Sequence, residues 1–323
     1  MKKNKILKVI IVLFLLITLT GCTKILKDEN NKAVRNEQTG QPVTENIICK
    51  PTDKKTIEIY KKNKVDIEKL PECNKIKITG KYENLWNSFF VRPLAFAIIK
   101  VGEFVKSNAV SIIIITIIIR LLLYSNTRKT LLQSENMKKA QPEIKKIEKK
   151  YEGKTDNESM QKKGQEMMMV YKKYNIKPLS GCLFAFIQLP ILLAFYEAIQ
   201  RVPAIFEESF FGLNMGTTPS VAISKGYWGY IIICVILILV TYLSFKTNPS
   251  MNNKKDKKVN EKEKDIMGSQ QKMMGPMMTV FIGIMSFTLP TAIAFYWITS
   301  SLFTIFQNLT MKRGKEAWMY NHS

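Results

Sequence analysis

The chain has 323 residues, of which 49 are Lys or Arg and 26 are Asp or Glu, so its net charge is +23. Nucleic-acid binding is one common reason for such a balance, but most of this charge lies between long apolar runs, where it sets orientation in a membrane. We therefore expect no nucleic-acid partner. The single histidine, His322, and five cysteines without zinc spacing give no basis for a metal site, and no catalytic or cofactor-binding motif is present. We expect no enzyme activity, metal or cofactor.

Residues 1–21 have the form of a secretory signal, with four lysines before an apolar run. The segment ends in Leu19-Thr20-Gly21-Cys22, which resembles a bacterial lipobox. In that motif the cysteine receives a diacylglyceryl group, with acyl chains such as palmitate, and becomes the new N-terminus. We expect Cys22 to be lipidated, which would place the next segment outside the cytoplasm. The alternative is an uncleaved first span that contains a cysteine by chance.

Residues 22–85 are polar and show no core-forming pattern, which predicts a lipid-anchored extracytoplasmic tether or a very small domain. Cys49 and Cys73 both lie there, and an oxidising exterior would allow them to form a disulfide. The next stretch, 86–106, is apolar but interrupted by a proline and several charges. This pattern favours an amphipathic helix on the outer face of the membrane over a span.

Residues 107–124 form the first predicted span, because the run is about as long as a bilayer core requires. It contains Arg120, and a cation at the centre of a span costs roughly 2.5–3.5 kcal/mol on insertion scales. One explanation is snorkelling, since the long side chain could reach the interface near Tyr124. The other is a polar stripe, because Thr116 lies one turn earlier on the same helix face.

Residues 125–178 are polar, with 14 basic and 7 acidic residues. Two stretches of helix-forming residues flank a turn at Gly153, which predicts an antiparallel helical hairpin. The second helix is rich in methionine, at Met160, Met167, Met168 and Met169. Two interpretations are open: these side chains pack between the two helices, or they form an adaptable surface for varied apolar clients.

Four more apolar runs predict four further spans, separated by two polar loops and followed by a short tail. The spans are 179–198, 226–243, 273–289 and 291–311, the loops are 199–225 and 244–272, and the tail is 312–323. Gln188 lies in the middle of the second span, and Tyr296 and Trp297 lie in the fifth.

The charges of the connecting segments predict the topology. The hairpin carries net +7, the 244–272 loop has 8 basic and 4 acidic residues, and the 199–225 loop has 2 of each. Basic loops remain in the cytoplasm, so the first span runs inward and five spans leave the C-terminus inside. The predicted fold is an all-α polytopic membrane protein. It has a five-helix transmembrane core, a cytoplasmic helical hairpin and an outer-face amphipathic helix.

Three stretches in this order resemble the YidC-type membrane protein insertases. They are IIIITIIIRLLLY followed by a charged hairpin, Phe186-Ile187-Gln188-Leu189-Pro190-Ile191 with Tyr196, and Phe295-Tyr296-Trp297-Ile298-Thr299-Ser300 with Gln307. The similarity covers about residues 86–312. Ser301 departs from the asparagine that the family often has, and the tail lacks the long basic extension of some members. With the lipobox and no large extracytoplasmic domain, the chain resembles members from Gram-positive-type bacteria.

The resemblance implies a protein that inserts and helps fold integral membrane proteins. Client spans would pass through a hydrophilic groove that is open to the cytoplasm and to lipid. By position, the groove would be lined by Arg120, Thr116, Gln188, Trp297 and Tyr296. The implied partners are nascent membrane protein clients and membrane lipids, with the Sec translocon and the ribosome as further candidates. The implied location is the bacterial plasma membrane, with multiple spans and the lipid-anchored N-terminus outside.

Other hypotheses stay open at this point. Gln188 and Trp297 could serve only to hold the helices together. The protein could be a secondary transporter or channel, although the centres of the predicted spans hold no carboxylate of the kind that cation transporters use. It could also be a non-catalytic membrane lipoprotein scaffold, in which case Arg120 should be freely replaceable.

Overall fold

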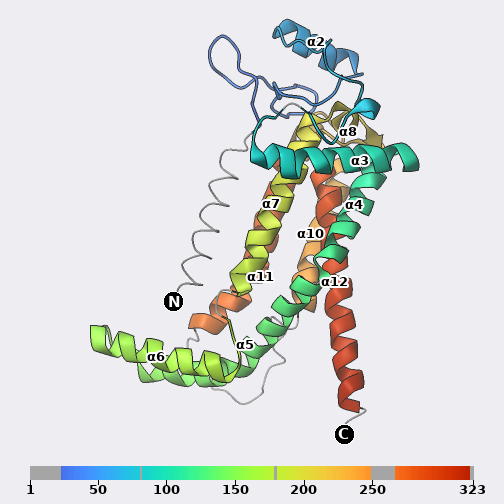
Figure 1. Ribbon diagram of the computed structural model, residues 1–323. Coiled ribbons are helices and arrows are strands. Elements are labelled where there is room, and N and C mark those ends of the chain that lie inside the picture. Colours follow the sequence, from blue (N-terminus) through green and yellow to red (C-terminus); the bar gives the residue numbers. More distant parts are fainter. Residues whose placement is uncertain (1–22, 81, 178–179, 249–265, 321–323) are drawn as a thin grey trace. The chain divides into compact units, whose positions relative to one another are not determined.

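The computed structural model describes residues 23–80, 82–177, 180–248 and 266–320. The predicted signal segment, Cys22 and most of the 244–272 loop lie outside the described residues. The chain is mostly helical, and Figure 1 labels its elements. In chain order they are α2 (Lys54–Lys62), η1 (Cys73–Lys75), η2 (Asn87–Val91), α3 (Arg92–Val105), α4 (Asn108–Leu122), α5 (Tyr124–Lys150), α6 (Asn157–Lys173), α7 (Ser180–Arg201), α8 (Pro203–Phe206), β1 (Ser209–Phe210), β2 (Leu213–Asn214), α9 (Pro219–Ser224), α10 (Gly229–Thr247), α11 (Ile266–Thr288) and α12 (Thr291–Tyr320).

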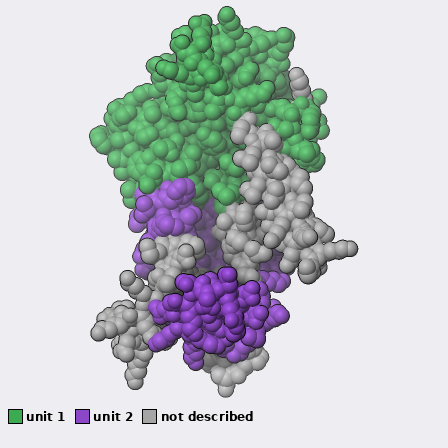
Figure 2. All heavy atoms as spheres, turned by 90° about the vertical axis from the view of Figure 1, so that its left-hand side faces the viewer, with its two compact units in different colours: residues 1–118, 188–237, 283–299 green, residues 119–187, 238–282, 300–323 purple. Residues whose placement is uncertain are grey.

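The chain divides into two compact units, which Figure 2 shows in different colours. Unit 1 contains residues 1–118, 188–237 and 283–299, and unit 2 contains residues 119–187, 238–282 and 300–323. Each unit therefore combines segments that are far apart in the sequence.

The N-terminal segment of unit 1 has a small core of its own. Its buried apolar residues are Leu26, Val43, Ile47, Tyr60 and Ile67. The Tyr60 hydroxyl donates a hydrogen bond to the backbone oxygen of Thr44 at 2.9 Å, which satisfies its polar end inside this core. A core of this kind fits a very small domain, the second of the two alternatives for this segment. These residues follow neither the period of a strand nor that of a helix, because they come from isolated bridges, one short helix and loops.

Cys49 and Cys73 form a disulfide that closes the loop containing α2, with 4.8 Å between their Cα atoms. The helix inside this loop begins after Asp53, whose carboxylate accepts a hydrogen bond from the Thr56 amide at 2.9 Å. A side-chain oxygen at this position satisfies one of the free amides at a helix start. The N-terminal segment is thus held by a covalent bond as well as by its core.

The stretch 86–106 forms the π-helix η2 followed by α3, which has Pro93 in its first turn. Proline has no amide hydrogen to donate, and Pro93 lies where the π-helix passes directly into the α-helix. The helix ends at Lys106, which adopts a left-handed conformation with φ of 59°. Figure 1 shows α3 running across the direction of α4. The Ser111 hydroxyl of α4 donates to the Ile98 carbonyl of α3 at 2.6 Å, which fastens the crossing.

The 199–225 segment is ordered and supports the start of α4. Its Glu208 carboxylate accepts hydrogen bonds from the Asn108 amide at 2.7 Å and from the Ala109 amide at 3.3 Å. A carboxylate at this position satisfies free amides and interacts favourably with the helix dipole. A segment with no net charge thus fixes the beginning of the helix that carries Arg120.

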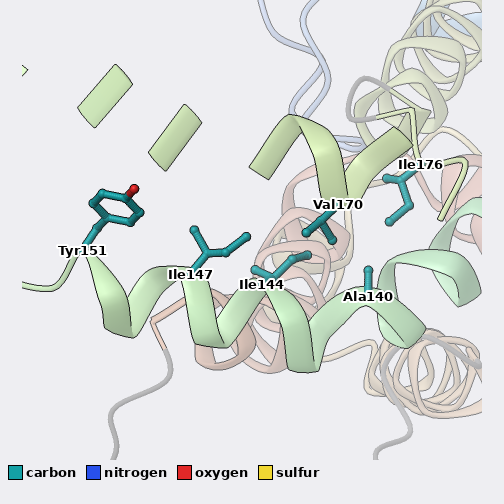
Figure 3. Close-up of a cluster of buried hydrophobic side chains, with 6 residues drawn as sticks. All are labelled: Ala140, Ile144, Ile147, Tyr151, Val170 and Ile176. Atoms are coloured by element: carbon teal, nitrogen blue, oxygen red, sulfur yellow. The ribbon is translucent and has the colours of Figure 1, made fainter. Parts of the chain in front are cut away.

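In unit 2, α5 and α6 form a helical hairpin that turns at Gly153, where φ is 76°. Apolar side chains of α5 point toward α6 and the residues after it (Figure 3). The buried cluster consists of Ala140, Ile144, Ile147, Tyr151, Val170 and Ile176. A short ion pair, Lys173 to Glu143 at 2.6 Å, links the two helices at the surface. Its hydrogen bond lowers the pKa of Glu143, but exposed pairs of this kind add little stability.

Among the described residues, α10 is a helix long and apolar enough by itself to cross a membrane. The pair α4 and α5, bent by 59°, passes the same test only when taken together. The five-span core and the residue ranges predicted for it remain predictions.

Ile144 tests the packing of the hairpin, because its side chain is only 1% exposed. Ile144→Ala should destabilise the hairpin by roughly 2–4 kcal/mol, since the change leaves a cavity between the helices. The measurement is amide hydrogen exchange of α5 and α6 in the full-length protein. Leu132→Ala is the matched control, because Leu132 lies on the same helix and is 45% exposed. Equal effects of the two variants would contradict the packing described above.

Candidate functional site

Arg120 lies near the end of α4 and is buried, with 8% of its surface exposed. Its guanidinium donates from Nη2 to the hydroxyl oxygen of Ser300, a buried residue of α12. A guanidinium remains protonated in proteins and carries five donors that need acceptors when buried. Ser300 supplies one acceptor without adding a negative charge. The arrangement places a permanent positive charge inside unit 2.

A second contact between α12 and the preceding helices lies two turns further on. The side-chain amide of Gln307 donates to the Thr127 hydroxyl at 2.7 Å, and Gln307 is itself buried. Thr127 belongs to α5, whereas Arg120 belongs to α4, and the chain breaks between these helices at Leu123. Ser300 and Gln307 are seven residues apart and so lie on one face of α12. One face of α12 therefore bonds to the helices on both sides of the break.

Unit 1 contains a polar pair between α7 and α12. The Gln188 side chain donates to the Tyr296 hydroxyl at 2.6 Å, and the ring of Tyr296 is fully buried. That ring also packs against Phe195, with 4.5 Å between the ring centroids. Trp297, the next residue, is buried as well. The structure thus brings Gln188 and Tyr296 together, as side chains from two predicted spans.

Thr116 is buried, and its hydroxyl donates to the carbonyl of Ile112, one turn earlier in α4, at 2.6 Å. Serine and threonine commonly satisfy their hydroxyls in this way inside apolar helices. The hydroxyl of Thr116 is therefore engaged within its own helix.

The four methionines of α6 fall into two groups. Met167 is partly buried and packs against the hairpin cluster. Met160, Met168 and Met169 are 54%, 50% and 61% exposed, respectively. Packing between the helices therefore applies to Met167, whereas the other three side chains are exposed, and their use as a surface for clients stays a prediction.

Several polar contacts of unit 1 were not identified from the sequence. The Trp86 indole donates to a carboxylate oxygen of Glu197 at 3.0 Å, and Arg201 pairs with Glu83 at 2.5 Å. The partners in each pair are more than a hundred residues apart. The only signal was the presence of charged residues at the end of an apolar run. For metals, the described part of the chain contains no cluster of three or more potential ligands.

The chain was compared with known sequences and structures. The model of the family described as "60Kd inner membrane protein" matches residues 100–317. The chain is 34% identical over 247 residues to "Membrane protein insertase YidC" of Oceanobacillus iheyensis, covering 76% of this chain and 91% of the relative. It is 36% identical over 247 residues to "Membrane protein insertase YidC 1" of Listeria monocytogenes, covering 74% of this chain and 78% of the relative.

A solved structure titled "Active YidC insertase crystal structure with the first transmembrane domain resolved" is 22% identical, with a TM-score of 0.48, and the match covers 78% of this chain and 50% of that one. The family match includes the segments that carry Arg120, Gln188 and Tyr296. Together with the two sequence relatives, it shows that this chain belongs to the 60Kd inner membrane protein family, the family of YidC-type proteins.

Proposed function

We propose that this protein is a membrane protein insertase, which moves apolar segments of nascent membrane proteins from the cytoplasm into the bilayer and helps them fold. The observation that carries the proposal is the buried cation Arg120 in an apolar run. A buried charge is costly and marks a functional site by default in a membrane segment. The names of the relatives support the same function.

Arg120 would act on the client by electrostatic attraction. A client span enters with a short tail that must cross the membrane, and such a tail often carries carboxylates. In a partly hydrated cavity of low dielectric, a fixed cation attracts these groups more strongly than it would in water, although desolvation reduces the gain. Transfer of roughly 20 apolar residues into lipid, at a few tenths of a kcal/mol each, supplies the free energy. The process needs no nucleotide.

The polar residues of unit 1 would contact the client in a different way. The Gln188 amide and the Tyr296 hydroxyl bind each other at 2.6 Å, and both groups can donate or accept. They could exchange this bond for one to an unpaired backbone group of a client segment. We propose that Trp297 provides an adjoining apolar wall. The Thr116 hydroxyl is bonded within its own helix. Thr116 would therefore lie beside the path of the client segment without offering it a free hydrogen-bond donor.

The hairpin would receive clients before insertion. Met160, Met168 and Met169 present flexible apolar side chains at its surface, among many basic residues. Methionine adapts to apolar partners of different shape. The Sec translocon and the ribosome are candidate partners for delivery at this stage.

The proposed location is the bacterial plasma membrane. Cys22 would anchor the N-terminus to the outer leaflet, residues 22–106 and 199–225 would lie outside, and the basic hairpin and C-terminus would lie in the cytoplasm. Helix α3 would rest on the outer face as an amphipathic helix. Five spans complete this arrangement.

A secondary transporter or channel is the less favoured alternative. The acidic residue nearest to a predicted span centre is Glu197, at the end of α7, where it accepts the hydrogen bond from Trp86. An ion pathway would be expected to place a carboxylate deeper in the membrane.

The role of Arg120 can be tested with the purified protein in liposomes and two matched single-span clients, one with an acidic tail and one with a neutral tail. Arg120→Ala should lower insertion of the acidic client roughly tenfold, which corresponds to about 1.4 kcal/mol. The neutral client should be much less affected. Arg120→Lys should retain part of the activity, because it keeps the charge.

The control is Arg128→Ala, which removes one positive charge from an exposed position on α5. It should insert both clients normally. All variants must be reconstituted at equal abundance. If the acidic client inserts equally well with wild type and with Arg120→Ala, the electrostatic role of Arg120 is wrong. If wild type inserts neither client, the proposed function is wrong.

Client contact with the hairpin can be tested by site-specific photo-crosslinking. A photo-reactive residue in place of the exposed Met168 should capture a stalled nascent chain that carries an apolar span. The same residue in place of Met167 should react mainly with α5, because Met167 faces the hairpin cluster. If the photo-reactive residue at both positions forms adducts only within the hairpin, the methionines have a packing role and do not contact clients.

The topology can be tested by labelling single introduced cysteines in intact cells with a membrane-impermeant thiol reagent. Lys62→Cys, on the exposed face of α2, should react, because α2 is proposed to lie outside. Met168→Cys should react only after the cells are permeabilised. If Met168→Cys is labelled in intact cells, the proposed orientation is wrong.

A further inference from the structure

We propose that the Cys49–Cys73 disulfide is a thiol-sensitive clamp. It joins the end of α7 to α3 through the N-terminal segment, and it opens by attack of an external thiolate on Cys73. The two cysteines precede the part of the chain that matches the family, which begins at residue 100.

The Cys49 side of the clamp is fixed to α7. The amide of Ile48 donates to the backbone oxygen of Arg201, the last residue of α7, at 2.8 Å. In return, the Arg201 side chain donates from Nε to the Asn46 oxygen at 2.8 Å and pairs with Glu83 at 2.5 Å. The Arg201 side chain is buried, so these bonds are shielded from water. The chain just before Cys49 is thus held to α7 from both directions.

The Cys73 side is fixed to α3. Lys100 of α3 donates from Nζ to the backbone oxygen of Asn74 at 2.7 Å, and it also pairs with Glu103 at 2.9 Å. A second bond runs from Arg92 Nε to the Lys77 oxygen at 3.3 Å. The short helix η1, which begins at Cys73, is therefore attached to α3.

The disulfide connects these two attachments covalently. A backbone hydrogen bond from the Lys50 amide to the Pro71 oxygen, 2.8 Å long, runs beside it. Without the sulfur–sulfur bond, this hydrogen bond and the exposed ion pair between Lys50 and Glu68 at 2.7 Å would link the two sides locally. A single hydrogen bond is worth little net free energy in water. Reduction should therefore loosen the backbone around Cys49 and Cys73, while α7 stays joined to the residues just before η2 and α3 through the Trp86–Glu197 hydrogen bond and the Arg201–Glu83 ion pair.

The two sulfur atoms differ in accessibility. Cys49 is completely buried, whereas Cys73 is partly exposed and lines an open cavity of about 200 Å³. The charged residues around this cavity are Lys106, Glu103 and Glu208. Glu103 is paired with Lys100, and Glu208 is occupied at the start of α4. Lys106 offsets the negative charge of Glu208 at this cavity and so reduces the repulsion of an incoming thiolate.

The reaction is ordinary thiol–disulfide exchange with an external dithiol as reductant. One thiolate of the dithiol attacks Cys73 Sγ, a mixed disulfide forms there, and the Cys49 thiolate leaves and takes a proton from water. The second thiolate of the reductant then attacks its own sulfur in the mixed disulfide and releases the Cys73 thiolate. The reductant is oxidised to a disulfide by two electrons, and the protein disulfide is reduced by the same two.

The test uses the full-length protein in lipid nanodiscs. The monothiol 2-mercaptoethanol is added, the reaction is quenched with iodoacetamide, and peptides are mapped by mass spectrometry. The mixed disulfide should lie on Cys73 and the alkyl group on Cys49, with at least a tenfold excess over the reverse. Lys106→Asn, which suits the left-handed conformation, should slow the reaction roughly two- to fivefold. A mixed disulfide mainly on Cys49 would overturn the proposed direction of attack.

The coupling is tested by amide hydrogen exchange before and after reduction of the folded protein with dithiothreitol. The amides of Ile48 and Lys50 should exchange at least tenfold faster after reduction, while those of α5 and α6 should not change. The double variant Cys49→Ser and Cys73→Ser should exchange fast at these positions with or without the reductant. Unchanged exchange at Ile48 and Lys50 after complete reduction would show that the disulfide is not a clamp. Neither result depends on insertase activity.

Discussion

The burial of one guanidinium constrains how unit 2 is built. Arg120 cannot lose its proton, so its donors need acceptors that an apolar helix cannot provide from its own side chains. The Ser300 hydroxyl of α12 provides one. A hydroxyl can satisfy a guanidinium donor without adding a charge of its own. Ser300 therefore joins α12 to the helix that carries the buried cation.

The same helix stabilises the place where the chain leaves the first predicted span. At Leu123 the helix breaks, and α5 begins without a side-chain cap. The amides of Asn126 and Thr127 donate to the Leu123 oxygen at 3.1 and 3.0 Å, and the Thr127 hydroxyl donates to the Tyr124 oxygen at 2.9 Å. Gln307 then holds Thr127 from α12. The start of the hairpin is therefore held in place by α12. The exposed methionines lie on the helices of the hairpin itself.

The sequence was sufficient to predict those features whose signals lie within one short stretch of the chain. The hairpin could be predicted because a glycine turn separates two stretches of helix formers, and Arg120 because it interrupts an apolar run. The resemblance to a family added Gln188 and Tyr296, which the structure joins by a hydrogen bond. By contrast, the link between Arg201 and Glu83 joins residues 118 positions apart, and no periodicity points from one to the other. The small core of the N-terminal segment was missed for the same reason, since its members are scattered among bridges and loops.

The location of these missed contacts has a common physical cause. A helix satisfies its backbone groups internally except at its ends, where the last carbonyls have no partner within the helix. The N-terminal segment binds α7 at that point, through the Ile48 amide to the Arg201 oxygen and the Thr44 hydroxyl to the Gln200 oxygen at 3.3 Å. Glu208 uses the free amides at the start of α4 in the complementary way. Segments outside a membrane core can thus attach to it at helix ends without altering the faces of the spans. The N-terminal segment, which lies before the family match, is attached to α7 in this way.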